Sequence, residues 1–468
     1  MTRRALLSAA AAPACLRAAG SSTDMRIEEI RFNFEEMPCR TPLKFGGTVV
    51  ERIGLLNVKC TVSAGARTAN GFGSMPLGNA WSFPSRKLNY DQTLGAMKTL
   101  AGHIAKITGD YRAPGHPIDI TWTLEPEYLK ASVRATKDLE LAEPIPKLCT
   151  LATASPFDAA LHDAYGKLHG LNCYHTYGPR FLKHDLAQYL GAEFKGETLD
   201  RYVQKQPKPR MPMYHLIGAV DPLTDADLKK RIGDGLPETL PEWIRLNGLT
   251  HFKIKLNGDD LQWDVGRVVG VDRVVTETQK QRGVNRWSYS LDFNERCQNV
   301  RYLLEFLRQV KEKAAAGFER IQYVEQPTAR DLTKDRANVM HEAARIKPVV
   351  IDESLTDLES LLLAREMGYS GAALKACKGQ TQALLMAAAA QKYKMYLCVQ
   401  DLTCPGASLV HSAGLSAYIP GVAAIEANAR QFIPAANREW EQKLPGIFVV
   451  KDGTMRTAVL TGKGLGAV

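Results

Sequence analysis

The stretch HFKIKL, residues 251–256, combines strand-forming apolar residues with two lysines, Lys253 and Lys255. Side chains two apart on a β-strand project to the same face, so both amines leave the strand in the same direction. Two ammonium groups that close raise the free energy of each other's charged form. We therefore expect neighbours that compensate these charges, or a site that uses them.

Further apolar stretches of similar length occur on both sides of this one. In chain order, with 251–256 as the second, they are MPMYHLIG (211–218), WSYSLDFN (287–294), IQYVEQP (321–327), PVVIDES (348–354), GAALKAC (371–377), KMYLCVQD (394–401) and GVAAIEAN (421–428). Helical patterns lie between most of them, among others at 264–281, 300–315 and 381–393. Eight strands alternating with helices predict an α/β fold with a TIM-type (β/α)7β barrel.

The residues before the barrel have a different pattern and predict an N-terminal α+β capping domain at 25–150. Residues 25–34 and 49–65 are typical of strands, whereas the glycine-rich residues 65–86 predict a long loop. We expect that loop, with Met75, Trp81 and Phe83, to close over a substrate together with residues 40–47. The barrel domain is then 151–440, and residues 441–468 form a C-terminal segment that packs on the cap.

The first 24 residues are typical of an export signal. Arg3 and Arg4 precede a short apolar run, as in twin-arginine signals, and APAC, ending at Cys15, is a weak match to a lipoprotein cleavage box. The alternative is a misassigned start, with Met25 as the first residue of a cytoplasmic protein. No later apolar run reaches the ~20 residues of a membrane helix, so we expect no membrane span.

The composition favours a globular enzyme over other classes. With 45% hydrophobic and 24% charged residues the chain is neither disordered nor fibrous. The net charge of +10 is spread along the chain, which favours a basic surface over nucleic-acid binding. The nine cysteines show no CxxC spacing, so we expect no zinc site and no disulfide framework. A homo-oligomer is the default for an enzyme of this size.

Ionisable residues recur where the predicted barrel strands end, which is where barrel enzymes place their chemistry. The second to sixth strands end, in order, with Lys253 and Lys255, with Asp292 and Asn294, with Glu325, with Asp352 and Glu353, and with Lys375. Three carboxylates from successive strands would repel one another in a small volume unless a cation lies between them. Oxygen ligands without His or Cys favour Mg²⁺, so we predict one divalent cation.

Lys255 and Lys375, on the second and sixth strands, would face each other across the barrel mouth. Such a pair can remove a proton α to a carboxylate from one face and return it to the other, because one amine acts as base while the opposite ammonium acts as acid. Lys253 would lower the proton affinity of Lys255 and contact the substrate carboxylate. We therefore predict Lys255, Lys375 and Lys253 as catalytic residues.

The motifs HFKIKL, SLDFNE, YVEQP, VIDES and ALKACKG resemble, in order and spacing, the enolase superfamily and its muconate-lactonizing-enzyme subgroup. The resemblance covers roughly residues 25–440. It implies that Asp292, Glu325 and Asp352 bind Mg²⁺ and that Lys255 and Lys375 form the acid/base pair around an enediolate. It also implies a small-molecule carboxylate as substrate.

The remaining strand-end residues predict the substrate pocket: Asn294, Gln400, Asp401, Glu426 and Asn428. The seventh strand ends without a histidine, which argues against the mandelate-racemase branch. Family members that act on dipeptides carry two aspartates where this chain has Glu426 and Asn428, so a dipeptide substrate is not favoured. We expect Lys378 to be a solvated lysine in a loop or at the start of a helix.

Several activities fit the same residues. We favour a racemase or epimerase because both lysines are present, with cycloisomerisation and dehydration as alternatives. A Schiff-base aldolase using Lys375 would leave the three carboxylates unexplained. A metal-binding secreted protein without catalysis would have no need of two opposed lysines.

Overall fold

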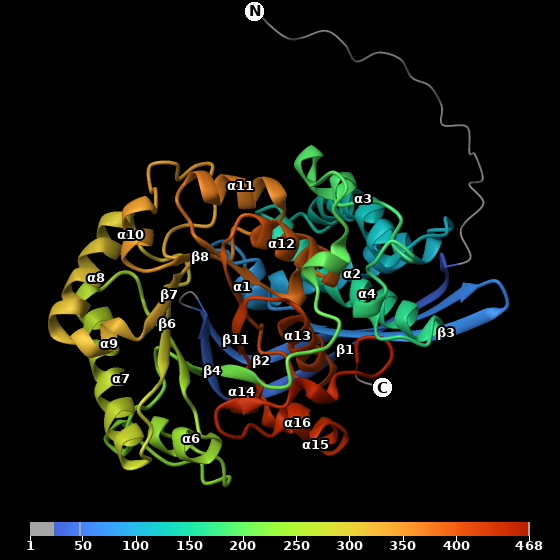
Figure 1. The fold of residues 1–468 in the computed structure, drawn as a ribbon. Coiled ribbons are helices and arrows are strands. Elements are labelled where there is room, and N and C mark those ends of the chain that lie inside the picture. Colours follow the sequence, from blue (N-terminus) through green and yellow to red (C-terminus); the bar gives the residue numbers. More distant parts are fainter. Residues whose placement is uncertain (1–22, 46–47, 467–468) are drawn as a thin grey trace, which may run out of the picture.

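A closed barrel of eight parallel strands forms the larger part of the molecule (Figure 1). The computed structural model describes residues 23–45 and 48–466, so the expected export signal lies outside the described residues but for its last two positions. The barrel strands are β4 (Met211–Ile217), β5 (His251–Lys255), β6 (Ser288–Asp292), β7 (Ile321–Glu325), β8 (Val349–Ile351), β9 (Gly371–Leu374), β10 (Tyr396–Val399) and β11 (Val422–Glu426). Pairing of Ile425 with Met213 closes β11 onto β4, which confirms the predicted fold class.

Helices follow the strands and cover the outside of the barrel (Figure 1). They are α6 (Leu240–Asn247), α7 (Leu261–Gln281), α8 (Val300–Lys313), α9 (Ala315–Glu319), α10 (His341–Ile346), α11 (Leu358–Glu366), α12 (Gln380–Lys392) and α13 (Gly406–Tyr418). The three helical patterns read from the sequence correspond to α7, α8 and α12. Asn299 starts α8 by accepting a hydrogen bond from the Tyr302 N–H, as an N-cap residue does.

The N-terminal part forms a three-stranded antiparallel sheet with three long helices beside it (Figure 1). The strands are β1 (Arg26–Phe45), β2 (Thr48–Ala64) and β3 (Arg67–Pro76), and the helices are α2 (Tyr90–Asp110), α3 (Pro117–Asp138) and α4 (Lys147–Leu168). Asn89 and Gln92 form a capping box at the start of α2.

The expected long loop at 65–86 was wrong. Residues 67–76 of this stretch form β3, and the short helix α1 (Asn79–Ser82) follows. A Cβ added to Gly71 would lie 2.1 Å from the Ala160 carbonyl oxygen, and one added to Gly73 would lie 1.9 Å from that of Pro156. The glycines that suggested a loop are therefore required because the backbone of α4 lies directly against this strand.

The barrel interior is divided into two layers. Apolar and aromatic side chains, Tyr214, Tyr323, Val350, Ala373, Cys398 and Ala424, form one buried cluster. Two residues further along, the inward positions of five of these strands are ionisable or polar, namely Glu325, Asp352, Lys375, Gln400 and Glu426, whereas β4 has Leu216 there. Because side chains alternate along a strand, the same face that fills the core at one level builds a polar chamber at the next.

The segment after residue 440 contacts both parts of the molecule. It contains α16 (Pro445–Phe448) and β12 (Thr454–Met455), and β12 pairs antiparallel with β4. Further on, the Leu465 N–H donates to Asp163 on α4. The end of the described chain thus links the first barrel strand to a helix of the N-terminal part.

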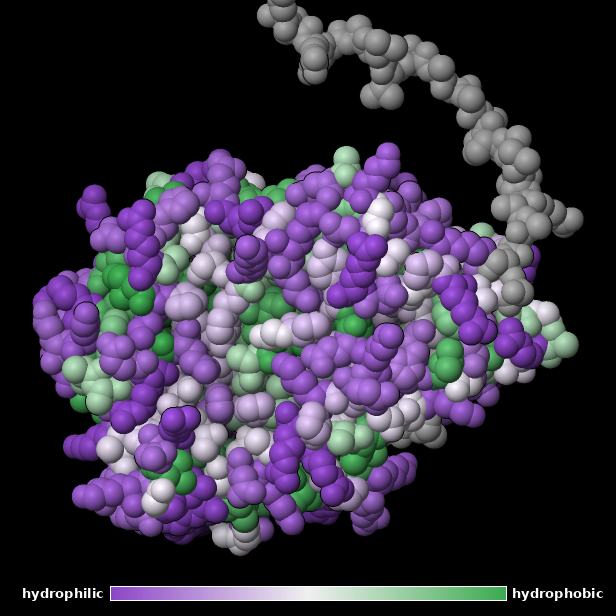
Figure 2. Space-filling model, in the orientation of Figure 1, coloured by the Kyte–Doolittle hydropathy of each residue, from purple (hydrophilic) through white to green (hydrophobic). Residues whose placement is uncertain are grey.

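The face drawn in Figure 2 is mostly hydrophilic, with hydrophobic residues scattered in small groups. Such a distribution is typical of a surface in contact with water. Among the described residues, none of the helices is long and apolar enough to cross a membrane.

Candidate active site

The register of the barrel strands brings the predicted site residues to one end of the barrel. Leu216 is opposite Lys253, Lys255 is opposite Asp292, and Asp292 is opposite Glu325. Asp352 and Lys375 directly follow β8 and β9. All of the catalytic and metal-binding residues predicted from the sequence are buried at this end, which we call the mouth.

Lys253 lies at the centre of this group. Its Nζ donates to Glu325 Oε1 at 2.8 Å, Glu426 Oε2 at 2.8 Å and Gln400 Oε1 at 2.7 Å, and Asp292 Oδ2 lies 3.0 Å away. Burial alone would lower the pKa of Lys253, but the surrounding carboxylates outweigh burial and the pKa lies well above its usual value. The amine is therefore held as an ammonium ion.

Lys255 and Lys375 belong to β5 and β9, four strands apart in an eight-stranded barrel and thus on opposite sides of the mouth. Lys255 Nζ donates to Asp292 Oδ2 at 2.5 Å and to Asn294 Oδ1 at 3.0 Å. Lys375 Nζ lies 2.9 Å from Asp352 Oδ2. Each of the two amines is thus oriented by a different carboxylate.

The carboxylates pair with these lysines and influence one another. Burial opposes ionisation of Asp292, but Lys253 and Lys255 hold its pKa below the usual range. Burial, and then the charge of Asp292, raise the pKa of Glu325, and Asp352 adds to this. The three acids are therefore close enough to repel one another, and the lysines supply the compensating charge.

The donor set fits a hard divalent cation. Glu325 Oε2 is buried without a hydrogen-bond partner, and the three acids offer oxygen atoms only, the type of ligand that Mg²⁺ prefers. In the described ranges, no three Asp, Glu, His or Cys side chains are already arranged around a position for a metal ion. The reason at the mouth is that the ammonium groups lie between the carboxylates. Asp292, Glu325 and Asp352 would hold the cation in exchange for part of this pairing.

The five predicted substrate-binding residues also lie at the mouth. Gln400 joins Lys253 to the Tyr323 hydroxyl, and Asn428 Nδ2 donates to Glu426 Oε1 at 3.0 Å. Asp401 Oδ2 accepts the Asn428 N–H, whereas its Oδ1 is buried without a partner. Burial, aided by the nearby charge of Glu426, raises the pKa of Asp401 to about 7.

Two further residues contact the site: Lys378, which was expected to be solvated, and Trp81, which was expected to lie over a substrate. Lys378 is buried, and its Nζ donates to the Asp352 carbonyl oxygen at 2.6 Å, so the reading of a solvated lysine was wrong. It lies three residues after Lys375 in a short 3₁₀ turn, which returns its side chain to the same side. The sequence feature that could have identified Lys378 as a site residue is the KxxK spacing directly after a barrel strand.

Trp81 is the second of these residues and comes from the N-terminal part. Its Nε1 donates to Glu353 Oε1 at 3.1 Å, and its ring centroid lies 4.4 Å from Lys375 Nζ. Burial and the charge of Asp352 raise the pKa of Glu353 to about 7. Met75 and Phe83, expected beside Trp81 over a substrate, pack in the hydrophobic cores instead.

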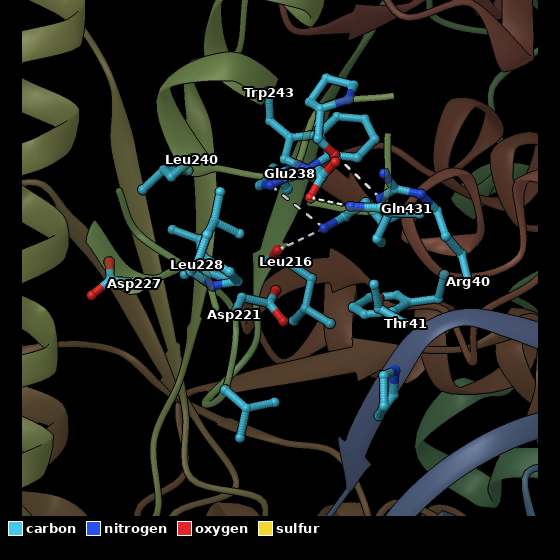
Figure 3. A pocket seen from close by; sticks show the side chains of 18 of the residues that line it. Arg40, Thr41, Leu216, Asp221, Asp227, Leu228, Glu238, Leu240, Trp243 and Gln431 are labelled. Atoms are coloured by element: carbon cyan, nitrogen blue, oxygen red, sulfur yellow. Dashed lines mark hydrogen bonds between the residues drawn. The ribbon is translucent and has the colours of Figure 1, made fainter. Parts of the chain in front are cut away.

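A cavity of about 310 Å³ lies beside the mouth, between β1 and the connection from β4 to α6 (Figure 3). Arg40 and Thr41 face it from β1, and Leu216 and Trp243 face it from the barrel. Arg40 forms a bidentate ion pair with Asp234 of that connection. This contact ties the end of β1 to the barrel.

The comparisons with known proteins agree with this architecture. The family described as "Enolase C-terminal domain-like" matches residues 236–468. No curated protein is similar enough in sequence to match the chain.

Solved structures with the same fold cover nearly the whole chain. A mandelate racemase/muconate lactonizing protein from Herpetosiphon aurantiacus is 18% identical, with a TM-score of 0.64 over 94% of this chain and 97% of that one. The muconate lactonizing enzyme of Pseudomonas fluorescens, complexed with muconolactone, is 18% identical, with a TM-score of 0.62 over 94% and 96%. The dipeptide epimerase of Enterococcus faecalis, complexed with Mg and L-Leu-L-Tyr, is 15% identical, with a TM-score of 0.62 over 94% and 99%. At these identities the likeness concerns the fold.

Proposed function

Because this chain belongs to the enolase superfamily, we propose that it is a Mg²⁺-dependent enzyme that removes the proton α to a carboxylate of a small organic acid. Within that class we propose a racemase or epimerase. The observation that carries the proposal is the placement of Lys255 and Lys375 on opposite strands of the barrel, each hydrogen-bonded to its own carboxylate.

The two lysines divide the reaction between the two faces of the α-carbon. One amine accepts the α-proton, and the opposite ammonium group donates a proton to the other face, which inverts the configuration. Asp292 and Asp352 orient the two amines through the hydrogen bonds described above. Lys253 is bonded to several acceptors, and we propose that it stabilises negative charge that develops on the substrate carboxylate.

Bound Mg²⁺ would act as a Lewis acid that stabilises the dianionic enediolate, with Asp292, Glu325 and Asp352 as its ligands. The indole of Trp81 excludes water from the Lys375 side of the mouth. Asp401 and Glu426, buried near Lys253, are available for a polar group of the substrate.

The test is proton exchange in D₂O, followed by NMR, with N-acyl amino acids, dipeptides and acid sugars. We expect loss of the α-proton signal of at least one compound, with formation of the opposite enantiomer or epimer. Isomerisation to a lactone would assign a cycloisomerase, and loss of water a dehydratase.

Two kinds of variant make the test specific. Lys255→Ala and Lys375→Ala should each stop inversion, and Asp292→Asn should also abolish Mg²⁺ binding measured by calorimetry. Unchanged Mg²⁺ binding by Asp292→Asn, or inversion that survives both lysine variants, would contradict the proposal. A chain that binds Mg²⁺ and carboxylates but exchanges no proton would be a binding protein.

A further inference from the structure

A buried aspartate binds the turn that follows each of the two opposed lysines. Asp264 accepts backbone N–H groups of the turn after Lys255, and Asp158 accepts a backbone N–H group just beyond the turn after Lys375. The two acids belong to the helices α7 and α4 rather than to barrel strands, and both are buried. Neither acid takes part in the reaction as proposed above.

Asp264 lies in the first turn of α7 and points back to the residues between Lys255 and that helix. Its Oδ1 accepts the Asn257 N–H at 2.7 Å, and its Oδ2 accepts the Gly258 N–H at 2.9 Å. The hydroxyl group of Tyr302, on α8, donates to Oδ2 at 2.5 Å. One carboxylate thus fixes two backbone N–H groups directly after Lys255.

Asp158 comes from the N-terminal part and binds the start of α12. Its Oδ2 accepts the Thr381 N–H at 2.7 Å, and its Oδ1 accepts the hydroxyl groups of Thr381 and Thr121, both at 2.8 Å. His162, one turn further along α4, places its Nε2 3.0 Å from the Thr381 hydroxyl oxygen. Two side chains of α4 therefore hold the first turn of α12.

A short 3₁₀ turn, Ala376–Lys378, connects this contact to Lys375. The Lys378 N–H donates to the Lys375 carbonyl oxygen at 3.1 Å, and the Gly379 N–H donates to that of Ala376 at 3.0 Å. The first turn of α12 begins at the next residue. Every step from Asp158 to the backbone of Lys375 is thus a hydrogen bond or a bonded residue of a tight turn.

Each of the two turns contains a glycine in the left-handed region, Gly258 with a φ of 73° and Gly379 with a φ of 104°. Glycine gives the unconstrained backbone its largest conformational freedom, so a turn built on it gains order from hydrogen bonds to groups outside the turn. Asp264 and Asp158 supply such bonds. The backbones that carry the two amines are restrained in the same way, from two different helices.

We infer that Asp264 and Asp158 are positioning residues, Asp264 for the Lys255 amine and Asp158 for the Lys375 amine. The inference rests on the proposed function, in which each amine transfers a proton at one face of the α-carbon. A displacement of about 1 Å at a reacting group can slow a reaction roughly 100-fold. Loss of either aspartate should therefore impair one face of the reaction and spare the other.

The first test measures α-proton exchange of separated enantiomers in D₂O, with the full chain and Mg²⁺. Asp158→Ala should slow exchange roughly tenfold or more for the enantiomer that Lys375→Ala no longer exchanges. Asp264→Ala should do the same for the enantiomer that Lys255→Ala no longer exchanges. The other enantiomer should be affected less than about threefold in each case. Equal slowing of both enantiomers would overturn the inference, because a general loss of structure affects both faces alike.

Replacement by asparagine should have different results at the two positions. The donors to Asp158 are one backbone N–H and two hydroxyl groups, and a hydroxyl group can also accept, so Asp158→Asn should restore most of the rate. Each oxygen of Asp264 accepts a backbone N–H, so the NH₂ group of Asp264→Asn would face one of these donors and the rate should stay low. The reverse pattern, or equal recovery at both positions, would overturn the inference.

Asp163→Ala is the matched control. Asp163 is another buried acid of α4, and it accepts backbone N–H groups of Phe72 at 2.9 Å and of Leu465 at 3.0 Å. Neither of these donors belongs to a turn after a lysine of the mouth. The control should therefore affect both enantiomers alike, and a preference equal to that of Asp158→Ala would overturn the inference.

A second test does not depend on activity. Hydrogen exchange, followed by mass spectrometry, should rise roughly tenfold or more at the Lys378 N–H in Asp158→Ala and at the Leu256 N–H in Asp264→Ala. Neither N–H group donates to the aspartate that is replaced, because their acceptors are the carbonyl oxygens of Lys375 and Asp292. A rise at these positions therefore reports movement of the backbone next to each lysine.

The two tests separate this inference from the proposed function. An equal rise at both N–H groups in both variants, or a rise at neither, would overturn the inference even if the parent chain exchanges α-protons. If the parent chain exchanges no α-proton, the proposed function is contradicted, and the hydrogen-exchange test alone decides whether the two aspartates hold the lysine turns.

Discussion

The indole ring of Trp81 covers the ammonium group of Lys375, with 4.4 Å between the ring centroid and Nζ. Trp81 belongs to α1 in the N-terminal part, whereas Lys375 follows a barrel strand. Arg330 Nη1 also donates to the Trp81 carbonyl oxygen at 3.0 Å. One face of the proposed reaction centre is therefore formed jointly by two parts of the chain that are far apart in sequence.

Replacement of Trp81 should weaken catalysis at the Lys375 face. A cation–π contact that is shielded from water contributes about 1–2 kcal/mol, so Trp81→Leu should slow α-proton exchange by roughly 5- to 30-fold. Trp81→Phe keeps an aromatic ring and loses only the hydrogen bond to Glu353, so its loss should be smaller. NMR exchange rates measure both, and equal losses in the two variants would show that the ring itself contributes nothing.

Replacement of each of the two opposed lysines should abolish α-proton exchange of a different enantiomer. In a racemase each lysine removes the proton from one enantiomer, so Lys255→Ala and Lys375→Ala should each slow inversion at least 100-fold, within the usual range for general acid–base groups. Each variant should still exchange the α-proton of one enantiomer, and the retained enantiomer should differ between them. The measurement is deuterium incorporation into separated D- and L-substrate.

If both variants lose exchange of the same enantiomer, only one lysine transfers protons. That result would favour a cycloisomerase or a dehydratase over a racemase.

The close approach of β3 to α4 should make Gly73→Ala strongly destabilising. The added Cβ would collide with the Pro156 carbonyl oxygen, and overpacking of this kind costs about 2–3 kcal/mol or more of unfolding free energy. Gly95→Ala is the matched control, because Gly95 lies within α2 and a Cβ there meets no atom within 4 Å. The control should be neutral or stabilising by up to ~1 kcal/mol, since alanine is the better helix former. Urea denaturation measures both, and equal stabilities would contradict the packing.

Arg40→Ala should loosen the contact between β1 and the connection from β4 to α6. The Arg40 side chain is 8% exposed and pairs bidentately with Asp234, so its loss should raise hydrogen exchange at residues 218–239 roughly tenfold, which corresponds to ~1.4 kcal/mol. Arg231→Ala is the control, since Arg231 pairs with Asp225 of the same connection and Glu242 of α6 rather than with residues of β1. Equal exchange in the two variants would show that Arg40 does not hold the connection in place.

The buried histidines contribute stability that should be lost as the pH falls from 6.5 toward 4, whereas Glu353 and Asp401, whose pKa values burial raises to about 7, act in the opposite direction. Burial lowers the pKa of His411 to about 4, and it also lowers the pKa values of His116 and His215. Between the folded and unfolded pKa the unfolded chain binds more protons, so stability rises with pH in that window and is lost as the pH falls through it. The loss is roughly 1 kcal/mol per pH unit for each such histidine.

Thermal melts at pH 7.5, 6.5, 5.5 and 4.5 test this dependence. His411→Gln keeps a polar side chain opposite Gln380 but cannot titrate, so its melting temperature should fall less steeply with pH. If the melting temperature of this variant depends on pH as steeply as that of the parent chain, His411 does not contribute to the pH dependence of stability.

The amino-acid sequence by itself determined the barrel and the residues at its mouth. Strand alternation has a period of two, and each βα unit repeats, so Lys253, Lys255, Asp292, Glu325, Asp352 and Lys375 could be assigned to strand ends without coordinates. These are local patterns that depend only on near neighbours in the chain.

Only the tertiary structure decided how those residues are paired and what covers them. The bond from Lys253 to Glu426 spans 173 residues, and the burial of Lys378 depends on Asp352 of another strand. The glycines of β3 predicted a loop because the sequence does not reveal that α4 packs against them. Contacts between distant segments follow from the packing of whole elements, and no local pattern records which partner a side chain meets.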